Sequence, residues 1–191
     1  MTYPHILAFG DSLTAGYGLS AHHSFAAQLE ALLRVRHPQA VVQNAGLSGD
    51  TSAGGLARLP RVLARLTAQP ALAIVELGAN DLLRNVAPAR MRANLDGILG
   101  ELARCGIPAL LAGMMAPPFL GAFAGRYNAV FPDLARAYGV PLYPFFLDGV
   151  VGDPTLTLAD RIHPNARAIG IVARRILPHV EAALGVERAA A

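Results

Sequence analysis

The chain has 191 residues, of which 53% are hydrophobic, and its formal net charge is +3. This length suits one domain with a sizeable core, and the hydrophobic content excludes a disordered protein. All 16 basic residues are arginines, which excludes Walker-type phosphate loops and Schiff-base enzymes because both need lysine. The arginines are dispersed along the chain, so no nucleic-acid partner is expected.

The first predicted element is a short buried strand over residues 6–9, which runs into the glycine-rich stretch 10–18. Glycines at the end of a strand let the backbone turn sharply and approach a ligand closely. A helix is predicted from Phe25, with Ser24 as its N-cap, to just before Pro38.

The middle of the chain alternates in the same way. A second strand over 40–44 ends in a polar, glycine-rich loop, and apolar residues at helical spacing predict a helix over 56–66. A third strand, 72–77, runs directly into Gly78-Ala79-Asn80-Asp81. A helix over 88–104 follows, with proline at its start and glycine just past its end.

The last third begins with a fourth strand over 107–112 and a long loop over 114–125. A helix is then predicted over 127–138 and a short fifth strand over 140–143. After a loop-like segment, the final helix is expected over 166–184.

Strands and helices therefore alternate along the whole sequence. That pattern indicates a parallel sheet with helices on both faces. Because no linker or repeat interrupts it, we expect one domain over 1–186, followed by a frayed tail over 187–191.

Four polar clusters stand out against this apolar background, at residues 10–12, 48–50, 78–81 and 160–163. The first three each follow a predicted strand. Loops that leave the carboxyl ends of parallel strands open on the same edge of the sheet. We therefore expect these clusters to meet in space.

The residue types in these clusters suit nucleophilic acyl transfer, which needs a hydroxyl, a base, a carboxylate to orient the base, and donors for an oxyanion. Ser12 supplies the hydroxyl, His163 the base and Asp160 the orienting carboxylate. Oxyanion donors are expected from the backbone N–H groups of Ser12 and Gly49 and from the side-chain amide of Asn80.

Three further acidic residues belong to these clusters, and a fourth precedes the third cluster by two positions. Asp11 is expected to bind loop N–H groups and fix the turn at the nucleophile, and Asp81 to brace its own loop in a similar way. Asp50 is expected to cap the helix that follows it. Glu76 is unusual in an apolar strand, and it is expected either to pair with an arginine or to lie at a sheet edge.

Together these motifs resemble those of the GDSL, or SGNH, hydrolase family. The four residues that give the family its second name correspond to Ser12, Gly49, Asn80 and His163, in the family's order and across nearly the whole chain. The resemblance implies a flavodoxin-like three-layer α/β/α sandwich with a five-stranded parallel sheet. It also implies a serine esterase that uses no metal and no cofactor.

Other stretches, at 48–52, 55–60 and 126–128, look like the branch of thioesterase I, lysophospholipase L1 and arylesterases. The expected substrates are small carboxylic esters, either short-chain or aryl, with acyl thioesters and lysophospholipids as further candidates. A carbohydrate O-deacetylase could use the same residues. A flavin- or phosphate-binding module is disfavoured by the acidic first loop, and a response-regulator-like domain by the missing lysine.

A substrate pocket is expected from apolar residues that follow the third and fourth strands. These are Leu82, Leu83, Met114, Pro117, Phe119 and Phe123. Apolar walls of this kind could accept an acyl chain or an aryl group, although core packing would equally explain each residue.

The remaining signals concern location and ligands. No apolar run approaches the ~20 residues that cross a bilayer, so no transmembrane segment is expected. The sequence as given starts without a signal-peptide pattern, which predicts a cytoplasmic protein, or a periplasmic or secreted one if a signal peptide was removed. The pair His22-His23 has no acidic partners nearby, so no metal site is expected. The oligomeric state is left open.

Overall fold

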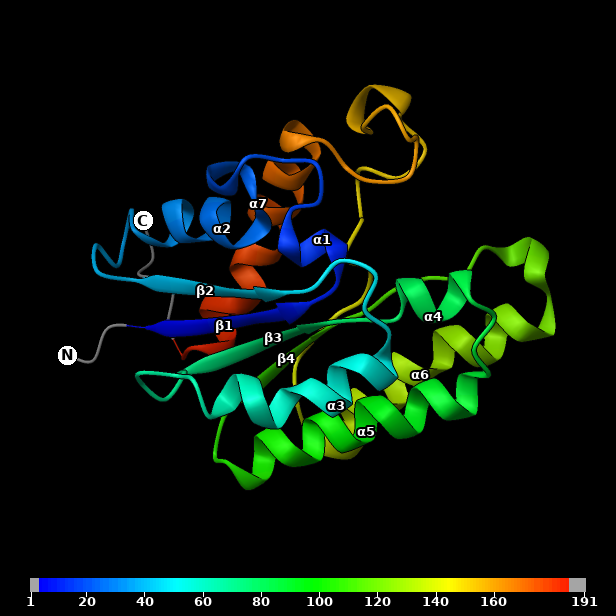
Figure 1. The fold of residues 1–191 in the computed structure, drawn as a ribbon, viewed down its shortest axis with the longest axis horizontal. Coiled ribbons are helices and arrows are strands. Elements are labelled where there is room, and N and C mark those ends of the chain that lie inside the picture. Colours follow the sequence, from blue (N-terminus) through cyan, green and yellow to red (C-terminus); the bar gives the residue numbers. More distant parts are fainter. Residues whose placement is uncertain (1–3, 186–191) are drawn as a thin grey trace.

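A computed structural model describes residues 4–185 and shows one sheet of five parallel strands (Figure 1). Its strand order is β2-β1-β3-β4-β5. The strands are β1 (His5–Gly10), β2 (Val41–Gly46), β3 (Leu72–Glu76), β4 (Ala109–Ala112) and β5 (Leu142–Tyr143). The predicted five-stranded parallel sheet is confirmed.

Helices cover both faces of the sheet. They are α1 (Ser12–Ala15), α2 (Phe25–Leu33), α3 (Ser52–Leu63), α4 (Ala79–Leu83), α5 (Pro88–Arg104), α6 (Ala122–Tyr138) and α7 (Ala166–Ala183). In Figure 1, α2 and α7 pack together on one face, while α3, α5 and α6 lie on the other. This arrangement is the three-layer α/β/α sandwich that the resemblance implied.

The core lies between these layers. Ile6 on β1 pairs with Val42 on β2 and with Leu72 on β3, so β1 is hydrogen-bonded to a neighbouring strand on both sides, and β3 and β4 are likewise inner strands. Strands covered on both faces need apolar residues at every position, which explains the unbroken apolar runs of the sequence. Each fully buried leucine, isoleucine or phenylalanine contributes roughly 1.5–3 kcal/mol to folding.

Three elements differ most from the sequence-based expectation. Short helices α1 and α4 replace turns after β1 and β3, and they place Ser12 and Asn80 in first helical turns. Helix α6 begins at Ala122, five residues before the predicted start at Tyr127, so the loop after β4 is shorter than expected. Two glycines at 121 and 125 suggested a loop, but Gly121 only starts the helix, with φ of 54°.

Other boundaries agree more closely. Ser24 caps α2 by accepting a hydrogen bond from the N–H of Ala27, as expected. Within residues 4–185, no helix combines the length and the apolar character needed to cross a bilayer. The predicted frayed tail over 187–191 lies outside the described residues, and the single-domain boundary at 186 stays a prediction.

Candidate active site

The site begins where β1 ends and α1 starts. Asp11 is the N-cap of α1, and its Oδ1 accepts a hydrogen bond of 2.9 Å from the N–H of Leu13. Ser12 is the first residue of α1, so its own N–H has no acceptor within the helix. A side chain at Gly10 would overlap Thr14 Oγ1 and the backbone oxygen of Glu76, and only glycine therefore allows this close packing.

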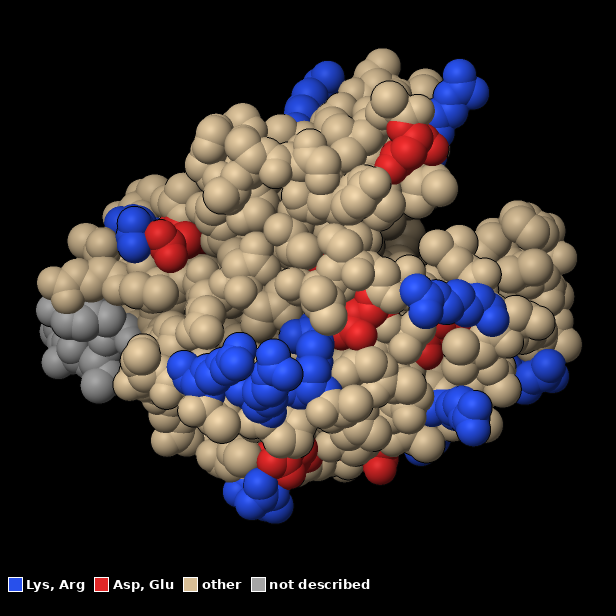
Figure 2. All heavy atoms as spheres, viewed as in Figure 1, with Lys and Arg blue, Asp and Glu red and all other residues tan. Residues whose placement is uncertain are grey.

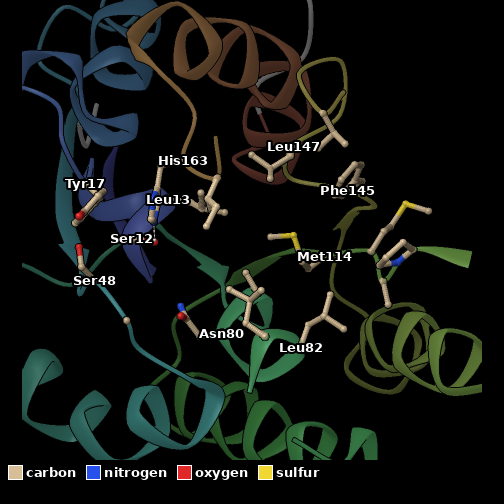
Figure 3. A pocket seen from close by; sticks show the side chains of 18 of the residues that line it. Ser12, Leu13, Tyr17, Ser48, Asn80, Leu82, Met114, Phe145, Leu147 and His163 are labelled. Carbon is tan, nitrogen blue, oxygen red and sulfur yellow. Dashed lines mark hydrogen bonds between the residues drawn. The ribbon is translucent and has the colours of Figure 1, made fainter. Parts of the chain in front are cut away.

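The His163 ring joins the serine to an aspartate. His163 Nε2 lies 3.0 Å from Ser12 Oγ (Figure 3). On the other side of the ring, His163 Nδ1 lies 2.7 Å from Asp160 Oδ2. The second oxygen, Asp160 Oδ1, accepts hydrogen bonds from the N–H groups of Ile162 at 2.9 Å and His163 at 3.0 Å. The ring of Tyr17 packs against the imidazole, with 4.3 Å between the ring centroids.

This set of hydrogen bonds keeps Asp160 ionised. The N–H groups of His163 and Ile162, and then the imidazole, stabilise the carboxylate and lower the pKa of Asp160 to about 2. The carboxylate is therefore negative at every pH near neutrality. A fixed negative charge at Nδ1 holds the ring so that Nε2 faces the serine hydroxyl.

Two further residues, Asn80 and Gly49, border the space next to Ser12. Asn80 Nδ2 donates one hydrogen bond of 3.0 Å to Asp11 Oδ2, and since a primary amide carries two N–H donors, the second is available to a ligand. Gly49 has a left-handed backbone, with φ of 81°, and its carbonyl oxygen accepts a 2.8 Å hydrogen bond from Arg84 Nη2. Ser12, Gly49 and Asn80 all line one cavity.

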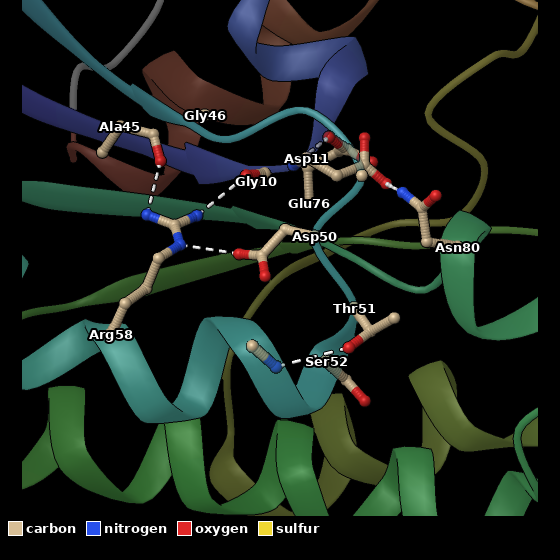
Figure 4. A network of polar contacts seen from close by, with 12 residues as sticks. Gly10, Asp11, Ala45, Gly46, Asp50, Thr51, Ser52, Arg58, Glu76 and Asn80 are labelled. Carbon is tan, nitrogen blue, oxygen red and sulfur yellow. Dashed lines mark hydrogen bonds and ion pairs between the residues drawn. The ribbon is translucent and has the colours of Figure 1, made fainter.

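Behind this group lies a buried pair of acids (Figure 4). Glu76 is fully buried, and its Oε2 accepts hydrogen bonds from Thr14 Oγ1 at 2.8 Å and from the N–H of Asp11 at 3.4 Å. Its Oε1 is buried with no hydrogen-bond partner among the described residues. The sequence-based expectation was wrong, because Glu76 pairs with none of the arginines within residues 4–185, and β3 lies between β1 and β4 rather than at an edge.

The burial of this pair raises the pKa of both acids. Loss of hydration raises the pKa of Asp11 to about 6, opposed by the hydrogen bonds from Leu13 and Asn80. Burial, and then the neighbouring Asp11, raise the pKa of Glu76 well above its ordinary value. Asp11 performs the expected bracing of the Ser12 turn, since it caps α1 and also contacts Asn80.

The other two acidic residues brace neighbouring elements. Asp81 accepts hydrogen bonds from the N–H and the hydroxyl of Ser52, at 2.7 and 2.5 Å, and so fixes α4 against the start of α3. Asp50 does not cap α3 as expected, because Thr51 takes that position and accepts from the N–H of Gly54. Asp50 instead forms an ion pair of 2.6 Å with Arg58 Nε.

The helical spacing of Arg58, Arg61 and Arg65 predicts a solvated helix face, and the structure corrects this for Arg58. Its two terminal nitrogens donate to the carbonyl oxygens of Ala45 and Gly10, each at 2.9 Å (Figure 4). Its guanidinium also lies 4.1 Å above the centre of the Phe9 ring. Arg58 therefore ties the ends of β1 and β2 together immediately before Ser12, a role that helical spacing alone could not reveal.

The cavity beside Ser12 has a volume of about 770 Å³ and mostly apolar walls. Figure 2 shows its mouth as a hollow between two projecting parts of the surface. Of the predicted pocket residues, four line it: Leu82, Leu83, Met114 and Pro117. Phe119, in the short 3-10 turn Pro118–Leu120, and Phe123, in the first turn of α6, do not line it.

Phe119 is 84% exposed to solvent, and Phe123 stacks on Tyr127 beside a separate hollow. Sequence reasoning missed several wall residues: Tyr17, Ser48, Phe145, Leu147, Val151 and Ile162. The last four lie between β5 and α7, a segment with little regular structure, so their sequence shows no helical or strand periodicity that would indicate their positions.

Among residues 4–185, no three His, Cys, Asp or Glu side chains gather closely enough to hold a metal ion.

Comparison with known proteins places this site in context. The model of the GDSL-like lipase/acylhydrolase family matches residues 8–168. Esterase TesA of Pseudomonas aeruginosa is 40% identical over 164 residues, covering 85% of this chain and 81% of the relative. The thioesterase 1/protease 1/lysophospholipase L1 of Escherichia coli K12 is 38% identical over 169 residues, covering 88% and 79%.

A solved structure agrees with the sequence relatives. The crystal structure of AlinE4, an SGNH-hydrolase family esterase, is 48% identical and superposes with a TM-score of 0.80. The match covers 96% of this chain and 98% of that one. The resemblance inferred from the four motifs is thereby confirmed.

Proposed function

The chain belongs to the GDSL-like lipase/acylhydrolase family and is a carboxylic-ester hydrolase, and on that premise we propose that Ser12, His163 and Asp160 form its catalytic triad. One observation carries the proposal. A continuous path runs from Ser12 Oγ through the imidazole to Asp160, with contacts of 3.0 and 2.7 Å. This is the order of groups that activates a serine for acyl transfer.

The reaction begins when Ser12 Oγ attacks the carbonyl carbon of the ester while His163 Nε2 takes the hydroxyl proton. The tetrahedral intermediate collapses, the carbon–oxygen bond to the alcohol breaks, and His163 returns the proton to the leaving oxygen. Water then attacks the acyl-enzyme with the same base, releasing the acid and restoring the serine. Asp160 keeps the ring oriented and stabilises the imidazolium at each step.

The oxyanion of each tetrahedral intermediate is stabilised by the N–H of Ser12, the N–H of Gly49 and the second N–H of Asn80. Three observations support this assignment. The Ser12 N–H has no helical acceptor, the Asn80 amide is held by Asp11, and both residues line the cavity with Gly49. Preorganised donors of this kind supply a large part of the stabilisation of an oxyanion.

The walls of the cavity favour an ester with an apolar acyl or aryl group. Side chains such as Leu82, Met114 and Leu147 surround the space next to Ser12. Thioesters and lysophospholipids fit the same walls, and the Escherichia coli relative is named for activity on both. A carbohydrate O-deacetylase would need polar groups to bind sugar hydroxyls, and these walls offer few besides Ser48.

The proposal is tested by Ser12→Ala assayed on p-nitrophenyl butyrate. The expected result is loss of all but about a thousandth of the turnover, with an unchanged circular dichroism spectrum. The matched control is Ser20→Ala, which removes an exposed hydroxyl and keeps full activity. Substantial turnover by Ser12→Ala would reject the triad. A separate panel of aryl esters, acyl-CoA and acetylated sugars, assayed with the wild-type protein, ranks the substrate classes.

A further inference from the structure

A lobe beside the mouth of the cavity carries an unusual combination of side chains. We define the lobe as residues 82–92 and 114–126, which are the end of α4 with the start of α5, and the β4–α6 connection with the start of α6. The two segments adjoin, because Leu83 and Pro118 line the main cavity together, while Ala89 and Arg126 share a second hollow. Figure 1 shows α4 beside the beginning of α6, beyond the carboxyl ends of the strands.

The tip of this lobe is apolar and open to solvent. Residues 114–125 contain no charged side chain. Phe119 is 84% exposed, and Met115 and Leu120 beside it are also exposed. Across the cavity mouth, Val151 and Ile162 are exposed as well. Side chains of this size rarely gather on the open surface of a protein unless they meet a partner.

The base of the lobe is purely basic. Both of its segments together contain no aspartate and no glutamate, and their charged residues are Arg84, Arg90, Arg92 and Arg126, all exposed. An apolar tip with a basic border is the pattern of surfaces that bind anionic lipid, because apolar side chains enter the acyl region while cations remain among the headgroups.

We propose that this lobe is a docking surface for an anionic phospholipid aggregate, into which Phe119 and Leu120 insert while Arg90 and Arg126 contact headgroup phosphates. The proposal goes beyond ester hydrolysis, since docking needs none of the chemistry at Ser12. Docked in this way, the cavity mouth faces the lipid, and an ester can pass from the aggregate to the site without crossing water.

A second copy of the chain fits this surface less well. A two-fold dimer places the same patch on both partners, so the arginines around each lobe would face one another. That contact would be electrostatically unfavourable, whereas an anionic lipid surface neutralises the same charges. Charge therefore favours lipid over self-association.

The test uses Ser12→Ala protein, so that no lipid is hydrolysed, in sedimentation with vesicles. Vesicles of equal parts phosphatidylglycerol and phosphatidylcholine are compared with phosphatidylcholine alone. The expected result is binding that is stronger to the anionic vesicles and that weakens as salt is raised. Added to this background, Phe119→Ser lowers the partition constant by about tenfold or more, and Arg126→Gln lowers it about fivefold.

Two control variants match these changes away from the lobe. Val35 is 81% exposed on the opposite end of the sheet from the cavity, and Val35→Ser removes a comparable apolar side chain. Arg65 follows the end of α3 and lines a separate hollow together with Arg58 and Arg61, and Arg65→Gln removes an equal charge. Both controls are expected to bind vesicles like the parent.

Docking is overturned if the parent fails to bind anionic vesicles, or if Val35→Ser weakens binding as much as Phe119→Ser. It is also overturned if Phe119→Ser leaves vesicle binding unchanged and instead converts a dimer into a monomer in analytical ultracentrifugation. In the wild-type background, Phe119→Ser leaves turnover of a water-soluble ester unchanged, because Phe119 does not line the cavity. Failure of docking can thus be separated from failure of the proposed triad.

Discussion

Asn80 stands at the junction of two hydrogen-bond systems. One N–H of its amide is fixed by Asp11 at 3.0 Å, and Asn80 also lines the cavity next to Ser12. The rotation of the amide is therefore decided before any substrate binds. Donors fixed in this way need no reorganisation when the oxyanion forms, and this is the source of their catalytic effect.

The change Asn80→Ala is expected to lower kcat by roughly 10²–10³ while KM stays close to its wild-type value. We expect kcat to change and KM to stay the same because, in this proposal, the second N–H donates to the oxyanion of the transition state and not to the ground-state ester. Steady-state kinetics on p-nitrophenyl butyrate measures both constants. An unchanged kcat, or a change in KM alone, would remove Asn80 from the oxyanion site.

Glu76 is expected to contribute to the pH dependence of folding stability. Its pKa is raised in the folded protein by burial and by Asp11, so the folded state holds a proton that the unfolded state releases. Stability from this group is therefore present below the unfolded pKa and is lost as the pH rises towards the folded pKa. Asp11, with its pKa raised to about 6, acts in the same direction.

Replacement of this acid by a neutral isostere, Glu76→Gln, is expected to stabilise the protein increasingly as the pH rises above 4.5. The gain in unfolding free energy is at most about 1.4 kcal/mol per pH unit, the limit for one proton. Urea denaturation between pH 4.5 and 8 measures it. The control Glu101→Gln should show no such gain, since Arg104 lowers the pKa of that carboxylate. Parallel curves for Glu76→Gln and wild type would contradict the account.

At the scale of secondary structure, the site depends on how strand ends are joined to the helices that follow. Arg58 on α3 binds the carbonyl oxygens of Gly10 and Ala45 and the carboxylate of Asp50. It thereby adds side-chain hydrogen bonds to the strand-to-strand hydrogen bonds at the carboxyl ends of β1 and β2. Asp81 joins α4 to α3 in the same way through Ser52.

The substitution Arg58→Leu is expected to lower the unfolding free energy by roughly 2–4 kcal/mol, because it leaves the nearly buried carboxylate of Asp50 without its cationic partner and removes one hydrogen bond from each of two carbonyl oxygens. Arg61→Leu on the same helix is exposed and should change it by less than about 0.5 kcal/mol. Chemical denaturation of both variants at pH 7 gives the comparison. Equal stabilities for the two would show that Arg58 is only a surface charge.

The sequence predicted elements better than it predicted the contacts between them. Unbroken apolar runs fixed the positions of β1 and β3, and the capping residue Ser24 located the start of α2. The role of Arg58 was not predictable, because it depends on two strands and a loop coming together in space. The environment of Glu76 could not be predicted either, since no local sequence pattern indicates that a carboxylate will face a second buried acid.

At the scale of the whole molecule, strand order explains why distant motifs meet. In the order β2-β1-β3-β4-β5, the loops after β2 and β3 lie on either side of the loop after β1. Gly49 and Asn80 therefore flank Ser12, although 37 and 68 positions separate them from it in the sequence. The sequence motifs predicted this convergence, but the wall residues between β5 and α7 could be found only in the folded molecule.

The central claim is that Ser12 is the nucleophile of an acyl-enzyme, and covalent labelling tests it most directly. The wild-type protein is incubated with an alkyl p-nitrophenyl phosphonate and digested, and the peptides are analysed by mass spectrometry. The account predicts one adduct per chain, on Ser12, formed in step with the loss of esterase activity and absent from His163→Ala. An adduct on another residue, or full activity in fully labelled protein, would contradict it.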